Sequence, residues 1–230
     1  MAANTKAGAR PRGKSMVVAA YDLIKDRILR NEYEPGFQAL EPEIAEELGM
    51  SRTPVREALI RLSNEGLVEV IPRRGFRVVP LSPADMTEIY QVLTALESMA
   101  AEVLAKRKPT LEELAPMEEA VAALNEALEN DDLDAWAVAD EQFHRSLLEL
   151  CGNQRLASMA ATVYDQAYRA RQISLRLRPK PWKSNEEHKA VLEAVKQGDW
   201  ILARKIHGEH RRNASRVLTE VLEKYQLHHL

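Results

Sequence analysis

Four polar side chains in the C-terminal half of the chain interrupt apolar helical patterns. Asp140 and His144 lie four residues apart, on or beside the apolar face of one predicted helix. His188 and His210 each fall in register with the apolar residues of a further helix. One carboxyl and three imidazoles are therefore expected to point into a helical core. The apolar residues that set the three registers are Trp136, Phe143, Leu147, Leu150, Val191, Leu192, Val195, Ala203, Ala214, Val217 and Val221.

Polar groups buried together are costly unless they share hydrogen bonds or a cation. Imidazole and carboxylate are ligands that Zn, Ni, Mn and Fe accept, and an Asp and a His four residues apart on a helix can bind one ion. The pattern indicates a divalent metal site formed by Asp140, His144, His188 and His210. The alternative is a set of hydrogen-bonded core histidines with a capping Asp. His207, one turn before His210, is a rival for its place.

A second group of chemically active residues lies near the N-terminus. From Ser51 onward a helix is predicted, with Ser51 as an N-cap whose side chain accepts from the first backbone N–H groups. Its apolar face leaves Arg52, Thr53 and Arg56 exposed at the helix start. Cations in this position oppose the helix dipole, so anions or guanine edges are expected as their partners. The residues that fix the helix are Pro54, Val55, Leu59 and Leu62.

The flanking segments fit a helix-turn-helix with a wing. A short helix over 42–48 ends at Gly49, and Gly49 and Met50 form the turn. After the second helix, β-rich runs at 67–71 and 76–79 are joined by Pro72-Arg73-Arg74-Gly75 and predict a hairpin. Its basic tip, with Arg74 and Gly75, is suited to a phosphate backbone or a minor groove.

The charge is unevenly distributed along the chain. Lys and Arg number 32 and Asp and Glu 35, for a net charge of −3 over 230 residues. Residues 1–81 hold 13 basic and 11 acidic side chains, and residues 50–77 hold six Arg against three Glu. A small local excess suits DNA contact through a few placed arginines, and the acidic remainder is expected not to touch DNA.

The sequence shows neither a disulfide framework nor a membrane signal. Cys151 is the single cysteine, and we interpret it as a small buried apolar residue in a protein of the reducing cytoplasm. No apolar run has the length of a membrane span, and the basic N-terminus lacks the apolar core of a signal peptide. We expect no membrane partner.

These elements predict a mostly α fold in which a winged helix-turn-helix is followed by an all-helical bundle. We expect a disordered basic tail at 1–15, a DNA-binding domain at 16–80 that begins with a helix at 16–30, and a bundle domain at 81–230. Ser82 and Pro83 mark the boundary as N-cap and first helical residue. The bundle helices are predicted at 83–107, 110–130, 132–151, 153–177, 184–197 and 199–227.

Residues 33–79 resemble the winged-helix domain of the GntR regulators. The matching residues are Pro35-Gly36, Ile44-Ala45, Leu48-Gly49, Ser51 to Leu59, Arg61-Leu62, Glu65-Gly66-Leu67 and Arg74-Gly75. The bundle resembles the FCD effector-binding domain of the FadR subfamily. Its matching residues are Asp140 to His144, Gly152-Asn153, Glu187-His188, Gly198-Asp199 and Glu209-His210.

The second resemblance implies a divalent metal (Zn, Ni or Mn) on Asp140, His144, His188 and His210, with a small organic acid in its open coordination positions. Family members often carry an Arg four residues before a Glu in the first bundle helix; here Leu93 stands four residues before Glu97. Arg169 or Arg171 is the expected replacement for binding the effector carboxylate, unless they lie on a solvated face.

Together these patterns predict a metabolite-responsive transcription regulator, acting as a repressor and not as an enzyme. Arg52 and Arg56 are expected to read guanine edges, with Thr53, Arg74 and Gly75 on the backbone or minor groove. One recognition helix covers few base pairs, so a homodimer on a palindromic operator is expected. The alternatives are a metal-dependent hydrolase fused to a DNA-binding module, and a regulator whose metal is purely structural or is itself the signal.

Overall fold

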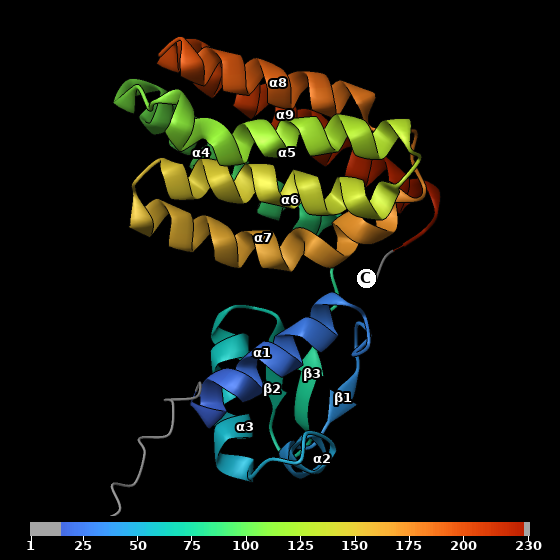
Figure 1. The fold of residues 1–230 in the computed structure, drawn as a ribbon. Coiled ribbons are helices and arrows are strands. Elements are labelled where there is room, and N and C mark those ends of the chain that lie inside the picture. Colours follow the sequence, from blue (N-terminus) through green and yellow to red (C-terminus); the bar gives the residue numbers. More distant parts are fainter. Residues whose placement is uncertain (1–14, 228–230) are drawn as a thin grey trace, which may run out of the picture. The chain divides into compact units, whose positions relative to one another are not determined.

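The computed structural model describes residues 15–227 (Figure 1). The chain divides into two compact units between Val79 and Pro80, here called the winged unit and the helical unit. The basic tail predicted for residues 1–15 lies outside the described residues, apart from Ser15. The side chain of Ser15 caps the first helix by accepting from the backbone N–H of Val18 at 3.3 Å.

The winged unit combines three helices with a small antiparallel sheet of order β1-β3-β2. The sheet was predicted as a hairpin, and β1 is an addition: two residues are too short to show the alternation that marks a strand. Residues from all three helices and the sheet share one apolar core, among them Ile24, Ile44, Leu62 and Phe76. The elements are α1 (Met16–Leu29), β1 (Gln38–Ala39), α2 (Glu41–Glu47), α3 (Arg52–Asn64), β2 (Val68–Ile71) and β3 (Gly75–Val78).

Helix α3 begins where the sequence predicts, but without the predicted side-chain cap. Ser51 occupies the N-cap position in an extended conformation, and its hydroxyl makes no capping hydrogen bond. The reason lies three residues on: Pro54 is at the position whose N–H an N-cap side chain commonly binds, and proline has no N–H to offer. The helix is held instead by burial of Val55, Leu59 and Leu62.

The wing is a tight hairpin whose last residue must be glycine. Ile71 pairs with Gly75 across it, and the Arg74 N–H donates to the Ile71 carbonyl at 3.0 Å. Arg73 follows Pro72 with a φ of +65°, the combination that a type II turn requires. Gly75 has a φ of +84°, and a Cβ built on it would lie 2.0 Å from the Ala39 carbonyl oxygen. Strand β1 therefore leaves no space for a side chain at residue 75.

The helical unit consists, over its described residues, of six helices that pack around shared apolar cores. Ser82 and Asp85 cap the first of them reciprocally, each side chain accepting from the other's backbone N–H. The predicted bounds lie within two residues of the observed ones, except that the last helix ends at Lys224 rather than 227. The helices are α4 (Pro83–Arg107), α5 (Leu111–Glu129), α6 (Leu133–Leu150), α7 (Gln154–Leu175), α8 (Trp182–Lys196) and α9 (Trp200–Lys224).

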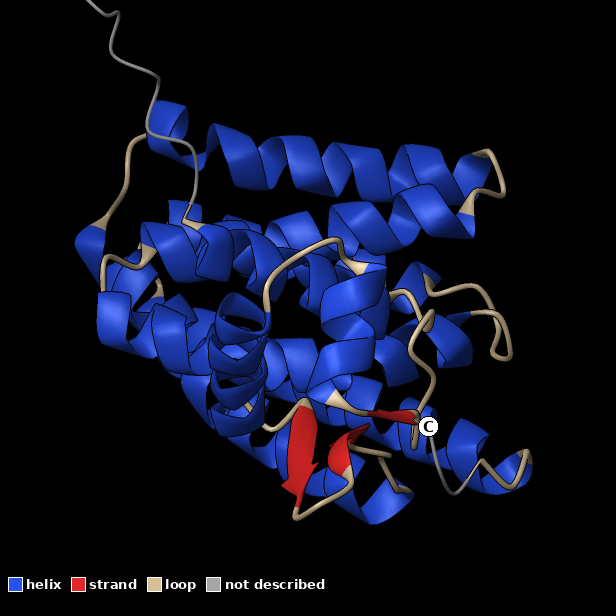
Figure 2. Ribbon diagram, turned by 90° about the horizontal axis from the view of Figure 1, so that it is seen from below, coloured by secondary structure: helices blue, strands red, loops and turns tan. Residues whose placement is uncertain are grey.

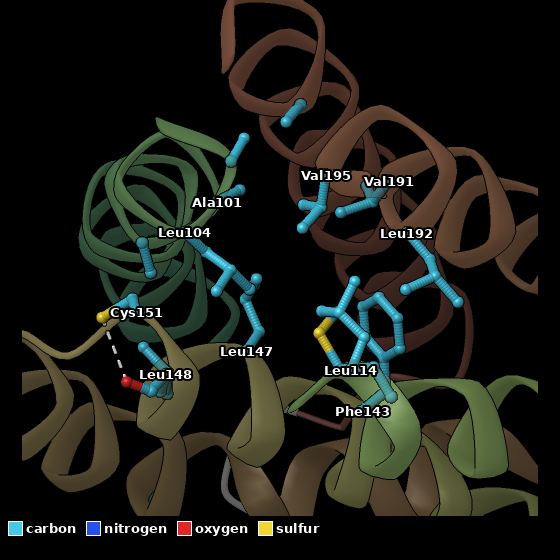
Figure 3. Close-up of a cluster of buried hydrophobic side chains, with 14 of the residues drawn as sticks. Ala101, Leu104, Leu114, Phe143, Leu147, Leu148, Cys151, Val191, Leu192 and Val195 are labelled. Carbon is cyan, nitrogen blue, oxygen red and sulfur yellow. Dashed lines mark hydrogen bonds between the residues drawn. The ribbon is translucent and has the colours of Figure 1, made fainter. Parts of the chain in front are cut away.

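In this unit α4 packs along α9, and α5 along α6 (Figure 1). In Figure 2 the red strands gather in one place, and most of the remaining described chain is blue helix connected by tan loops. Figure 3 shows the main core, where side chains of α4, α5, α6 and α8 converge. Cys151 is buried there, with its Sγ 3.1 Å from the Leu148 carbonyl, as expected of a small core residue. Within residues 15–227, no helix combines the length and the apolar character needed to span a bilayer.

Candidate functional site

The four residues predicted as metal ligands lie close together inside the helical unit. Asp140 and His144 come from α6, His188 from α8 and His210 from α9, and all four are buried. Among the described residues, the three imidazoles offer ring nitrogens that lie within 4.8 Å of one another. The Nε2 atoms of His144 and His188 are 3.1 Å apart, and Asp140 Oδ1 lies 3.4 Å from His188 Nε2 and 3.8 Å from His144 Nε2.

Two of these distances, 3.1 and 3.4 Å, fit a shared cation, whereas the 3.8 Å between Asp140 Oδ1 and His144 Nε2 is longer than an ion at its usual bond lengths would give. Two ligands bound to one ion at about 2.1 Å, with an angle near 90–110° between the bonds, lie about 3.0–3.4 Å apart. Two facing Nε2 atoms can form at most one hydrogen bond, and Nδ1 of His188 is buried without a hydrogen-bond partner. The core-histidine alternative requires every buried ring nitrogen to have a hydrogen-bond partner within the protein. This cluster does not meet that requirement.

The electrostatics of the cluster favour the forms that bind metals. Burial lowers the pKa of His188 to about 4 and holds the pKa of both His144 and His210 well below the ordinary value. Burial alone would raise the pKa of Asp140, but the neighbouring charges, led by that of Arg171, keep it below its ordinary value. The imidazoles are thus neutral and the carboxyl ionised, as metal ligands must be.

Two of the predicted ligands have outer partners that the sequence analysis did not assign to them. Glu187 Oε2 lies 2.9 Å from His210 Nδ1, and its Oε1 accepts from Asn213 Nδ2 at 2.7 Å. A carboxylate can only accept, so His210 Nδ1 carries the proton and Nε2 keeps its lone pair for a metal. Asp140 Oδ2 forms an ion pair with Arg171, which leaves Oδ1 facing the histidines.

Behind His144 lies a second buried polar group. Glu97, His144 and His207 also offer ligand atoms within 4.8 Å of one another. Glu97 Oε2 is 3.0 Å from His144 Nδ1 and 3.3 Å from His207 Nε2. Both Glu97 oxygens accept from Arg211, at 2.5 and 2.7 Å. Burial raises the pKa of Glu97, and the guanidinium of Arg211 opposes this shift.

The sequence carries a signal for this second group in the spacing of Glu97 and Arg211. Glu97 follows Leu93 by one turn on the buried face of α4, and Arg211 follows His207 by one turn on that of α9. The register argument applied to the histidines would have identified both residues as polar groups in the core. His207, named as a rival ligand, faces Glu97.

The arginines predicted to bind an effector occupy different environments. Arg171 pairs with Asp140, and its guanidinium lies 4.4 Å from the ring centroid of Tyr164. Arg169 is buried, and burial lowers its pKa to about 10. Leu93, at the position where family members often carry Arg, is fully buried in an apolar cluster of α4, α7 and α9. Arg171 is therefore engaged by a predicted metal ligand, and Arg169 lines neither the pocket beside His210 nor the small cavity beside Arg171.

The predicted DNA-contacting residues lie on exposed parts of the winged unit. Arg52, Thr53 and Arg56 are exposed over the first turns of α3, on the side opposite its buried face. Arg56 Nε lies 3.9 Å from Glu41 of α2, a weak surface pair that leaves the guanidinium available. Arg74 is exposed in the hairpin, and Gly75 begins β3 beside it. The arrangement offers cations from a helix start and from a wing.

Family models match both units of the chain. The model of bacterial regulatory proteins of the gntR family matches residues 17–78, and that of the FCD domain matches residues 88–213. The FCD model thus covers the helices that carry Asp140, His144, His188 and His210, together with the outer partners of the cluster.

Relatives and solved structures agree with these models. An HTH-type transcriptional regulator of the TAR-I ttuE-ttuC′ intergenic region of Agrobacterium vitis is 48% identical over 57% of this chain and 78% of its own. One from an unstable DNA locus of Streptomyces ambofaciens is 31% identical over 84% of this chain and 80% of its own. The structure of Escherichia coli McbR/YncC matches with a TM-score of 0.75 at 25% identity, covering 90% of this chain and 99% of that one.

The matched family and these relatives are transcription regulators and not enzymes, which argues against the hydrolase alternative. The winged unit and the helical unit correspond to the two matched models, in the same order along the chain. This chain therefore belongs to the GntR family of bacterial transcription regulators and carries an FCD domain.

Proposed function

We propose that this protein is a transcription repressor of the FadR subfamily whose helical unit binds a divalent metal and a small organic acid. The observation that carries the proposal is the convergence of Asp140, His144, His188 and His210 inside an FCD domain joined to a winged helix-turn-helix. The winged unit would bind DNA, and the buried cluster in the helical unit would bind the metal and the acid that regulate it.

At the DNA, a cytoplasmic homodimer would bind a palindromic operator, one winged unit to each half-site. Arg52 and Arg56 would read guanine edges in the major groove, because a guanidinium matches the two acceptors of guanine. Thr53, Arg74 and Gly75 would contact the backbone or the minor groove and fix the register. The exposure of Arg52, Thr53, Arg56 and Arg74 supports the assignment.

In the helical unit, Asp140 Oδ1 and Nε2 of His144, His188 and His210 would hold Zn, Ni or Mn. When bound, the ion supplies a Lewis-acidic anchor for a carboxylate. Glu187 keeps His210 in the required tautomer, and Arg171 keeps the second oxygen of Asp140 occupied. The acid regulates only if it has different affinities for the DNA-competent and DNA-incompetent arrangements, and we propose that it favours release.

Elemental analysis of the purified protein, with and without chelator, tests the proposal. We expect about one divalent metal per chain, and a thermal-shift screen in which an organic acid stabilises only the metal-loaded form. His188→Ala should lose the metal, because it removes a ligand at the centre of the cluster. Metal without any response to acids would instead support a structural or metal-sensing role. Absence of metal after reconstitution would refute the metal site.

A further inference from the structure

A pocket of about 210 Å³ opens beside His210. Its walls come from the loop between α7 and α8, from the start of α8 and from α9. Glu187 is its one acidic side chain, and both oxygens of Glu187 already accept from the protein. Its basic side chains are Arg178, Lys180, Lys183 and Arg216. The pocket therefore carries a cationic excess next to a residue of the proposed metal site.

Three of the four cations have partners. Lys180 Nζ lies 2.6 Å from Asp131, Arg216 lies 3.3 Å from Glu220, and Lys183 lies 3.9 Å from Glu187. Arg178 differs, because within residues 15–227 it forms no ion pair. Its Nε is buried without a hydrogen-bond partner. Burial lowers the pKa of Arg178, as expected of a cation removed from water without a paired anion.

Arg178 also lines a second, smaller cavity of about 20 Å³, together with Trp136, Tyr164 and Arg171. Its guanidinium lies 5.9 Å from the ring centroid of Trp136. One side chain thus borders both the pocket that contains His210 and the cavity that contains Arg171, the partner of Asp140. An anion bound to Arg178 would therefore lie beside the cluster of proposed metal ligands.

We propose that Arg178 binds one carboxylate of a small acid that carries at least two anionic groups. The inference rests on the proposed function, since the other carboxylate would be anchored at the metal. A partly buried guanidinium is stabilised by a carboxylate that accepts two hydrogen bonds from it, and Lys180, Lys183 and Arg216 add attraction at the rim. The pocket is smaller than the roughly 300–1,000 Å³ of sites for drug-sized ligands, which restricts the ligand to a compact acid.

Isothermal titration of the metal-loaded, full-length protein tests this with matched acids. Succinate is compared with butyrate, and malate with 2-hydroxybutyrate, because each pair differs only in a terminal carboxylate or methyl. We expect the diacid of a pair to bind about 10–100-fold more tightly, the effect of a hydrogen bond to a charged group. Arg178→Gln should remove that difference without changing metal content. Arg176→Gln is the matched control, since Arg176 is exposed, pairs with Asp134 and lines neither space.

The outcomes separate the two proposals. Equal binding of mono- and diacids, or an Arg178→Gln variant that binds as the parent does, would overturn the role of Arg178 and leave the metal site standing. A metal-loaded protein that binds no acid would contradict both proposals. If Arg178→Gln fails to fold, Arg178→Lys serves instead: it keeps the charge but loses the fork, and should bind diacids with an intermediate affinity.

Discussion

His210 is held in place by a carboxylate from another helix, and this contact can be tested separately from the ligands. Glu187 accepts from His210 Nδ1 and is itself held by Asn213. The ring therefore has a fixed tautomer before any ion arrives. Such outer partners affect metal affinity by orienting a ligand, and their loss leaves the number of ligands unchanged.

Glu187→Gln should weaken metal binding by about 10–100-fold, because an amide no longer holds the proton on His210 Nδ1 as firmly. Competition with a chromophoric chelator measures the affinity. Glu186→Gln is the control, since Glu186 is the exposed neighbour. Equal affinities of the two variants would show that Glu187 does not orient the ligand.

Gly75 supports the wing by having no side chain. Gly75→Ala should destabilise the winged unit by more than the roughly 1–3 kcal/mol of an unfavourable φ, because the Cβ would also meet the Ala39 carbonyl oxygen. Gly36→Ala measures the cost of the unfavourable φ alone, because Gly36 has a φ of +80° but nothing lies within 4 Å of its Cβ position. Denaturant unfolding followed by far-UV circular dichroism compares them. A smaller loss for Gly75→Ala than for Gly36→Ala would contradict the role given to β1.

At the scale of the element, helix α3 separates residues that contact solvent from residues that hold the fold. Arg52 and Arg56 are exposed, whereas Arg61, five residues after Arg56, lies 3.8 Å from the ring centroid of Tyr21 and pairs with Glu65. One helix thus carries arginines with two different roles, and substitution can distinguish them.

Arg52→Ala or Arg56→Ala should weaken operator binding by about 1–3 kcal/mol if the contact is to a base, and leave thermal stability unchanged. Arg61→Ala should lower thermal stability and leave operator affinity unchanged, since it removes a cation–π contact and an ion pair within the winged unit. Fluorescence anisotropy with an operator duplex gives the affinities. Unaltered operator affinities for both the Arg52 and the Arg56 variants would remove α3 from the DNA interface.

The elements that the sequence predicted well are the long helices, in which the apolar pattern repeats over several turns. Over the helical unit, apolar spacing placed six helices, and the same registers brought His144, His188 and His210 together. Strand β1 was missed because two residues carry no period. The predicted side-chain cap at Ser51 was wrong because Pro54, three residues later, has no backbone N–H to donate. Arg178 was not identified because it lies in a loop, where position depends on tertiary contacts that no spacing encodes.

At the scale of the molecule, the two units have separate apolar cores and respond to different perturbations. The core of the winged unit contains no residue of the helical unit. All three tryptophans, Trp136, Trp182 and Trp200, belong to the helical unit. Their fluorescence therefore reports on one unit without a label.

Chelation of the metal should lower the unfolding temperature seen by tryptophan fluorescence, because a ligand that binds only the folded state stabilises it by mass action. The unfolding of the winged unit, followed by probes placed within residues 16–78, should not change. His188→Ala should show the lower temperature before chelator is added and no further change after it. An unfolding temperature that changes neither with chelator nor with the His188→Ala substitution would contradict metal binding in the helical unit.

The proposed ligands come from α6, α8 and α9, and the whole of α7 separates α6 from the other two in the sequence. A bound ion would therefore act as a reversible cross-link between segments far apart along the chain. Opening of the helical unit would require loss of the ion or movement of these three helices together. Amide hydrogen exchange in α6, α8 and α9 should slow together as metal is added, so that the metal supply would set the rate at which this unit opens.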